Sequence, residues 1–318
     1  MCCPLEVFVS LQVPREDREF AKQNNIAGLT SESLRAIKNE KKGYTLKRAQ
    51  DFLKFQDRIN KVLFQHKVIT NNQFTKWFAE GQVSREQVRA FIVQFSVFSN
   101  LFLIAQLKKM INAPHIEGMR ASKEILANEI GVIFNSSKAQ TSMKKVKDKD
   151  REGDPELVST EGTIEGGKFR FQAAHFEWLL KIANKLDLQF NEIGKRRLGT
   201  KSTLFFCDEL ARLYGSEDYE ISQAASYAIE NWAAAGFWKE LIEGLSLFRE
   251  KHCRDLPLAF FAWHDKLEAQ HALHTQEEIE EYFFENDLDQ DKFLKKGNEM
   301  LDAIWVFWDG LDQLRKSL

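Results

Sequence analysis

Apolar residues recur at intervals of three and four through most of the chain, the spacing that places them on one face of an α-helix. Ser84 and Gln87 have the form of a capping box, so one helix is predicted to begin there. Alternation typical of β-strands is scarce. The predicted helices cover about residues 46–68, 84–111, 116–133, 169–186, 202–214, 219–249, 256–284 and 293–318. The pattern therefore predicts an all-α protein.

Two segments lack this pattern. Residues 1–45 are polar and weakly patterned, and we interpret them as an N-terminal extension that could contain short helices. Residues 136–168 contain no aromatic residue and are rich in charged and small residues, so they cannot bury enough apolar surface to fold alone. We expect one helical domain over residues 46–318, with a mobile polar insertion at about 136–168.

Charge and cysteine content narrow the classes of function. A net charge of −2 and a pI near 6.4 provide no bulk attraction for nucleic acid or an anionic membrane, so neither is expected as a partner. The most apolar stretch, residues 91–107, is interrupted by polar residues and is predicted to be a buried helix rather than a membrane span. The four cysteines form neither a disulfide framework nor a zinc pattern, which favours a reducing, cytoplasmic location.

Three polar residues fall on one face of the predicted helix at 256–284. At about 100° per residue, His264, Glu268 and His271 lie within an arc of about 60°. Burying such groups without partners is costly, so a metal ion would be a suitable partner. The alternative is a solvent-exposed stripe of His and Glu. A ferritin-like site is disfavoured because Glu268-x-x-His271 is the one Glu-x-x-His pair in the chain.

Three more polar residues lie within apolar surroundings. Glu230 shares a helix face with alanines that would leave room for a ligand, although it could equally point to water. Glu129 near a helix end is an ordinary exposed glutamate when taken alone. His175 lies among aromatic residues, where a hydrogen-bonded core histidine is the usual case. Spacing alone leaves the role of all three open.

The order of these residues along the chain resembles the order of the metal-ligand motifs in the haem-oxygenase-like di-iron oxidases and oxygenases. This family has the haem oxygenase fold but does not bind haem. His264-x-x-x-Glu268-x-x-His271 has the spacing of the family's last ligand motif, with Glu in place of the more usual Asp. The resemblance covers roughly residues 70–314 and implies a bundle of about seven core helices. The ligand set that it implies is Glu129, His175, Glu230, His264, Glu268 and His271. One departure is the long separation of Glu129 from His175, which would have to be neighbours across the insertion.

The resemblance also implies the chemistry. Two Fe(II) ions would bind O2 as a peroxo species and oxidise a small organic substrate of amino-acid or fatty-acid type. The nitrogen and oxygen donors suit Fe(II) or Mn(II). An external electron donor could take part, and the chain could form a homodimer. Phe98, Trp232, Phe237, Phe260 and Phe261 could line an apolar substrate pocket, although such residues are more often core.

Two other functions stay open. A metal-free enzyme on the same fold, an oxidase or hydrolase, would carry no stoichiometric iron. A helical interaction protein without catalysis would use the extension and the insertion instead.

Overall fold

The computed structural model describes residues 13–134, 169–171 and 175–318. Within these ranges it leaves out the side chains of residues 117, 128, 132–134, 169–171 and 267–271. The predicted insertion at 136–168 lies outside the described residues.

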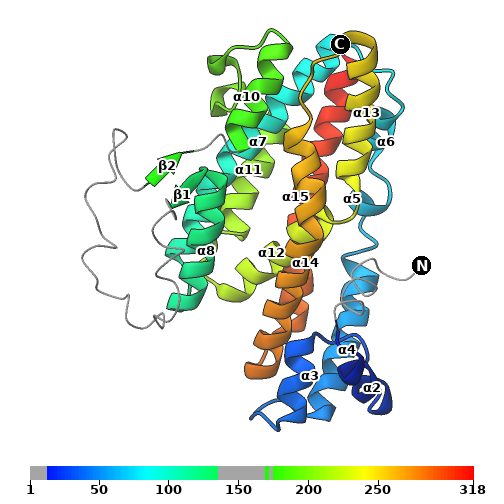
Figure 1. Ribbon diagram of the computed structural model, residues 1–318, viewed down its shortest axis with the longest axis vertical. Helices are drawn as coiled ribbons and strands as arrows, with labels where there is room; N and C mark the ends of the chain where they lie inside the picture. The colour runs from blue at the N-terminus through cyan, green and yellow to red at the C-terminus, as the bar shows by residue number, and fades with distance from the viewer. Residues whose placement is uncertain (1–12, 135–168, 172–174) are drawn as a thin grey trace.

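The described chain is all-helical apart from one short hairpin, as predicted (Figure 1). The α-helices are α2 (Arg15–Gln23), α3 (Ser31–Lys38), α4 (Leu46–Val62), α5 (Lys67–Thr70), α6 (Gln73–Ala79), α7 (Arg85–Ile111), α8 (Ile116–Glu129), α10 (His175–Lys185), α11 (Lys201–Leu213), α12 (Tyr219–Ala233), α13 (Phe237–His252), α14 (Ala259–Glu285) and α15 (Gln290–Lys316). Two 3-10 turns, η2 (Phe190–Glu192) and η3 (Arg196–Leu198), join α10 to α11.

Helix α7 is the central core helix. It begins with the predicted capping box, in which the Ser84 side chain accepts from the Gln87 backbone and the Gln87 side chain accepts from the Ser84 backbone. It packs against α8, α10 and α11 and buries Phe91 and Phe95. Among the described helices it is long and apolar enough to cross a membrane by length and composition, but 44% of its apolar window is buried inside the fold.

The prediction was wrong at the two ends of the insertion. The helix expected to reach residue 133 ends at Glu129, and Gly131 follows with φ +70°. Strands β1 (Val132–Phe134) and β2 (Phe169–Phe171) then pair in antiparallel register, with Val132 opposite Phe171. β1 is Val-Ile-Phe and β2 is Phe-Arg-Phe, and runs of only three residues are too short for periodicity to distinguish them from helix. Helix α10 therefore starts at His175 rather than at residue 169.

The helix predicted over 219–249 is two helices. Helix α12 ends at Ala233, and α13 begins at Phe237 after Gly236, whose φ is +105°. Glycine adopts this left-handed conformation without the steric cost of a Cβ atom. The preceding alanines are strong helix formers, so the break was not visible in the pattern. The helix predicted over 46–68 likewise ends early, at Val62.

The N-terminal helices pack onto the far end of the bundle. Helices α2 and α3 lie beside α4 and the C-terminal part of α14 (Figure 1). Leu34, Ile37 and Tyr44 belong to the same apolar core as the rest of the chain. Thr30 donates from its backbone nitrogen and its hydroxyl to the buried carboxylate of Glu280, at 3.0 and 2.7 Å. This segment is therefore tied to α14 by both apolar and polar contacts.

Candidate metal centre and its pocket

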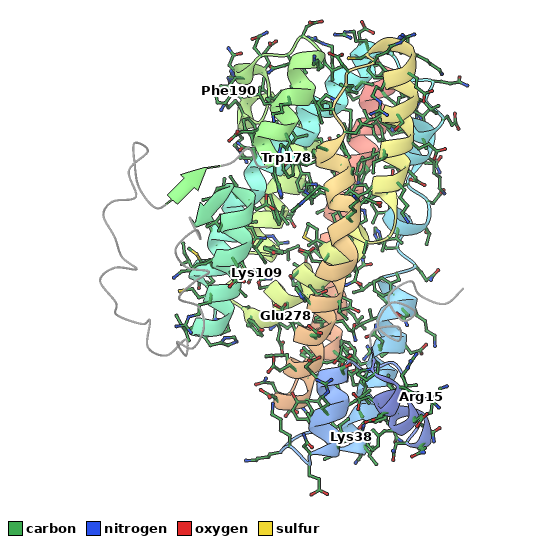
Figure 2. All side chains as sticks on the ribbon, viewed as in Figure 1. Arg15, Lys38, Lys109, Trp178, Phe190 and Glu278 are labelled. Atoms are coloured by element: carbon green, nitrogen blue, oxygen red, sulfur yellow. The ribbon has the colours of Figure 1, made fainter. Side chains whose placement is uncertain are left out.

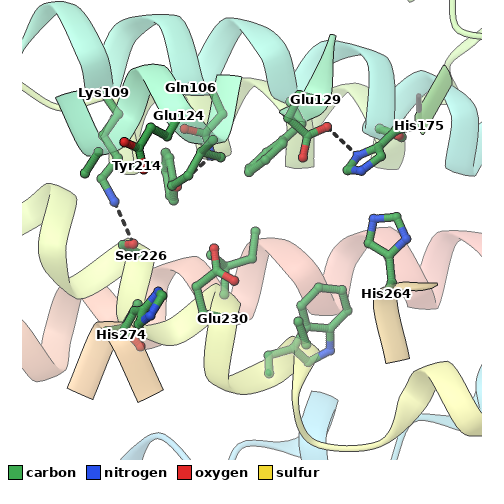
Figure 3. Close-up of a pocket in the computed structure, with 18 of the residues that line it drawn as sticks. Gln106, Lys109, Glu124, Glu129, His175, Tyr214, Ser226, Glu230, His264 and His274 are labelled. Atoms are coloured by element: carbon green, nitrogen blue, oxygen red, sulfur yellow. Dashed lines mark hydrogen bonds and ion pairs between the residues drawn. The ribbon is translucent and has the colours of Figure 1, made fainter. Parts of the chain in front are cut away.

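A cavity of about 750 Å³ runs between α7, α8, α12 and α14. Its size is that of an ordinary small-molecule site. Four of the six predicted metal ligands lie on its wall, namely Glu129, His175, Glu230 and His264 (Figure 3). Of the aromatic residues proposed for a pocket, Phe98, Trp232 and Phe260 line it. Phe237 and Phe261 are buried core residues outside its lining.

Glu129 and His175 are in direct contact. The Nδ1 atom of His175 lies 2.6 Å from Oε2 of Glu129, and the two side chains are 7% and 13% exposed. Glu129 is the last residue of α8, and His175 is the first of α10. The pairing of β1 with β2 between these helices brings the two helix ends together. The sequence left open whether His175 lies near Glu129 across the insertion, and the structure places the two side chains in contact.

His264 lies beside this pair. Its ring centroid is 4.7 Å from that of His175 and 4.7 Å from that of Trp238, which stacks on it at 23°. The Nδ1 atom of His264 donates to the Phe260 carbonyl at 2.7 Å. In the neutral ring, Nε2 therefore carries the lone pair. This tautomer, fixed by a backbone carbonyl, is typical of metal-binding histidines.

Glu230 projects into the cavity from α12. Figure 3 shows it between the end that holds His175 and His264 and the end that holds Lys109 and Ser226. The open question of whether Glu230 points to the pocket or to bulk water is thereby settled in favour of the pocket.

Glu268 and His271 lie on the same helix as His264. Helix α14 is continuous through both positions, so the three residues share one face, as predicted. The side chains of Glu268 and His271 are outside the described part of the structure. Among the side chains that are described, no three His, Cys, Asp or Glu residues come close enough together to hold a metal ion. The six-residue ligand set therefore stays a prediction.

The other end of the cavity is polar, and sequence reasoning missed it. Lys109 donates to Ser226 Oγ at 2.9 Å, and its ammonium lies 4.6 Å from the ring centre of Tyr214. Gln106 donates to the Tyr214 hydroxyl at 2.9 Å. A lysine in the last turn of a helix is commonly a solvated residue that stabilises the helix dipole, so the sequence carried no signal for its inward position.

Several carboxylates surround this polar end. Glu124 reaches it from α8, and Glu277, Glu278 and Glu281 reach it from α14. Burial raises the pKa of Glu277, and the nearby Glu32 adds to the shift. Burial also raises the pKa of Tyr214, which keeps its hydroxyl protonated. This end of the cavity thus combines one ammonium group with several acidic side chains.

Comparison with solved structures identifies the fold. The chain is similar to a TenA homolog from Pseudomonas syringae pv. tomato str. DC3000, with a TM-score of 0.52 and 12% identity. The match covers 84% of this chain and 93% of that one. The fold is therefore the all-helical haem oxygenase-like fold, as predicted. No protein-family model and no curated protein matches the sequence.

Proposed function

We propose that the protein is a non-haem di-iron, O2-dependent oxidase or oxygenase that acts on a small organic substrate. The main support is that Glu129, His175, Glu230 and His264, which come from four different helices, all line one cavity. The contact between Glu129 and His175 is the most specific part of this support. The resemblance required these two residues to be neighbours although they are distant in sequence.

The donor chemistry of the described residues fits Fe(II). Two imidazoles and two carboxylates form a nitrogen and oxygen set of the kind that Fe(II) or Mn(II) binds. His264 is held in the tautomer that offers Nε2 to a metal. The contact with Glu129 leaves Nε2 of His175 as the donor atom, because a carboxylate accepts from Nδ1. Oε2 of Glu129 would then orient His175, and Glu129 would have to bind a metal through Oε1 or give up this contact. When bound, the iron pair would supply the reduction of O2.

The protein's own residues would give the site its shape and exclude water from it. Phe260, Trp238 and Trp263 pack around the two imidazoles at centroid distances of 4.3, 4.7 and 5.0 Å from His264. Such a wall fixes the ring orientations and limits the access of water to the metal-binding end.

A metal-free enzyme on the same fold is the second candidate. The observation in its favour is the 2.6 Å contact of Glu129 with His175, because a histidine oriented by a carboxylate can act as a general base. This candidate requires no iron for activity.

Anaerobic titration of the metal-free protein with Fe(II), followed by exposure to O2, distinguishes the two. We expect about two irons per chain and a transient visible absorption band. Glu230→Gln and His264→Ala should reduce the bound iron. His252→Ala is the matched control, because His252 is exposed on α13 and does not line the cavity. Iron at background level in the unmodified protein would refute the proposal.

A further inference from the structure

Lys109 brings a positive charge into the interior of the cavity. Burial by itself lowers the pKa of an ammonium group, but interactions with Tyr214, Glu278 and Glu230 outweigh it, and the pKa of Lys109 lies above its usual value. The group is therefore charged at neutral pH. An ammonium group has three N–H donors, and Ser226 accepts from it at 2.9 Å.

Glu278 brings a negative charge to the same end from α14. Its Oε2 atom is buried and has no hydrogen-bond partner in the described part of the chain. Its charge acts on Lys109, yet no ion pair joins the two side chains among the described residues. Figure 2 shows Lys109 and Glu278 at the same level of the bundle. Gln106 adds a second buried acceptor without a partner, its Oε1 atom.

Buried charges and buried acceptors are costly to leave without partners. Here the ammonium of Lys109 and the carboxylate of Glu278 line one cavity without forming an ion pair with each other. The buried acceptor oxygens of Glu278 and Gln106 lack a hydrogen-bond donor among the described residues. A ligand that carries one negative group and one positive hydrogen-bonding group satisfies both requirements. A simple carboxylic acid or a simple amine satisfies one of them.

We propose that this end of the cavity binds the zwitterionic head group of an α-amino acid. Its carboxylate pairs with the ammonium of Lys109, and its ammonium donates to Oε2 of Glu278 and Oε1 of Gln106. This assignment concerns the described residues alone and does not depend on iron.

The position of the head group sets which part of the ligand reaches the histidines. Glu278 lies fourteen residues beyond His264 on α14, about 21 Å along the helix axis. Ser226, which fixes Lys109, precedes Glu230 by one helical turn on α12, about 6 Å. Phe98 and Phe102, which precede Lys109 on α7, also line the cavity. If the proposed function holds, the carboxylate of the amino acid therefore lies away from the histidines.

Binding to the metal-free, full-length protein tests this assignment with three probes that share one tail. L-norleucine carries both head groups, hexanoate lacks the amine, and pentylamine lacks the carboxylate. Isothermal titration calorimetry should show norleucine binding at least about tenfold more tightly than either of the others. Equal binding of hexanoate or pentylamine, or no binding of norleucine at millimolar concentration, would overturn the proposal.

Two variants separate the two halves of the head-group site. Lys109→Met should remove the preference for norleucine over pentylamine, and Glu278→Gln should remove the preference over hexanoate. Lys108→Met is the control, because Lys108 is the exposed neighbour on the same helix. Circular dichroism establishes that each variant is folded. If Lys109→Met and Lys108→Met bind all three probes alike, Lys109 is an internal counter-ion to Glu230 and Glu278, and the proposal fails.

The result of the Fe(II) titration and the result of the norleucine titration test separate proposals. Iron binding without a preference for norleucine would leave the proposed function intact and refute the head-group site. The reverse result would refute the di-iron proposal alone.

Discussion

Oε2 of Glu129 and Nδ1 of His175 lie 2.6 Å apart, although the two residues are 46 positions apart in the sequence. The antiparallel pairing of Val132–Phe134 with Phe169–Phe171 produces this contact, because it closes the chain between α8 and α10. Closing a long loop costs little more than closing a short one, so the insertion is compatible with a precise site at its base.

Glu129→Gln tests the role of this carboxylate. An amide cannot supply the negative charge that orients and strengthens a metal-binding imidazole, so the affinity for Fe(II) should fall by about 10- to 100-fold. Fe(II) titration of the variant measures the change. Glu177→Gln, an exposed change on α10, should have no effect. Unchanged affinity in Glu129→Gln would show that the contact with His175 plays no part in metal binding.

Replacing residues 135–168 with a short Asn-Gly turn tests whether the insertion is needed. The hairpin can be closed by a short turn between Phe134 and Phe169, because these residues face each other in the register. We expect the melting temperature and the iron stoichiometry to be retained. An interaction protein that works through the insertion would also keep its fold, but it would lose the binding of its partner. Loss of the iron stoichiometry in the variant would contradict the expectation.

The buried carboxyl group of Glu280 should make the free energy of unfolding depend on pH. Burial raises its pKa, and hydrogen bonds from Ser33, Gln276 and Thr30 only partly oppose the shift. Because the pKa is higher in the folded protein than in the unfolded chain, protonation of Glu280 favours folding. Its contribution therefore increases as the pH falls through the folded pKa and is complete below the unfolded pKa.

Urea unfolding of the wild type and Glu280→Gln across this pH range measures the effect. The stability of the wild type relative to the variant should rise as the pH falls from neutral. Glu281→Gln is the exposed control on the same helix. A difference between wild type and Glu280→Gln that does not vary with pH would contradict the assignment.

Gly244→Ala tests the packing of α13 against α6. A Cβ atom at this position would lie 2.1 Å from the Phe78 carbonyl oxygen, so the helices would have to separate. We expect a loss of about 1–3 kcal/mol in the free energy of unfolding, measured with urea. Glu243→Ala changes an exposed position on the same helix and should be nearly neutral. A loss in Gly244→Ala no greater than that in the control would show that the helices are not closely packed.

The helices that bear the site were predictable because their periodicity is strong. Helix α7 and its capping box at Ser84 follow from local sequence alone. The break at Gly236 was missed because the alanines before it favour helix, and the left-handed conformation becomes visible only in the folded chain. The β1–β2 hairpin was missed because runs of three residues are too short to show a reliable period.

The site was predictable only in part, for a different reason. His175 and His264 were found through a motif order, and the structure places their rings 4.7 Å apart. Lys109 and Glu278 belong to no motif, and each is an ordinary charged residue in its own helix. Their common cavity arises from the packing of α7, α12 and α14, and this is a tertiary property that no local pattern encodes.

The most direct test of the di-iron proposal is anomalous diffraction at the iron edge from crystals grown anaerobically with Fe(II). We predict two iron positions in the cavity, each at a coordination distance of about 2 Å from side chains of α8, α10, α12 or α14. His175, Glu230 and His264 should be among the ligands. An iron-free cavity in crystals grown with excess Fe(II), or iron bound only at the protein surface, would contradict the account.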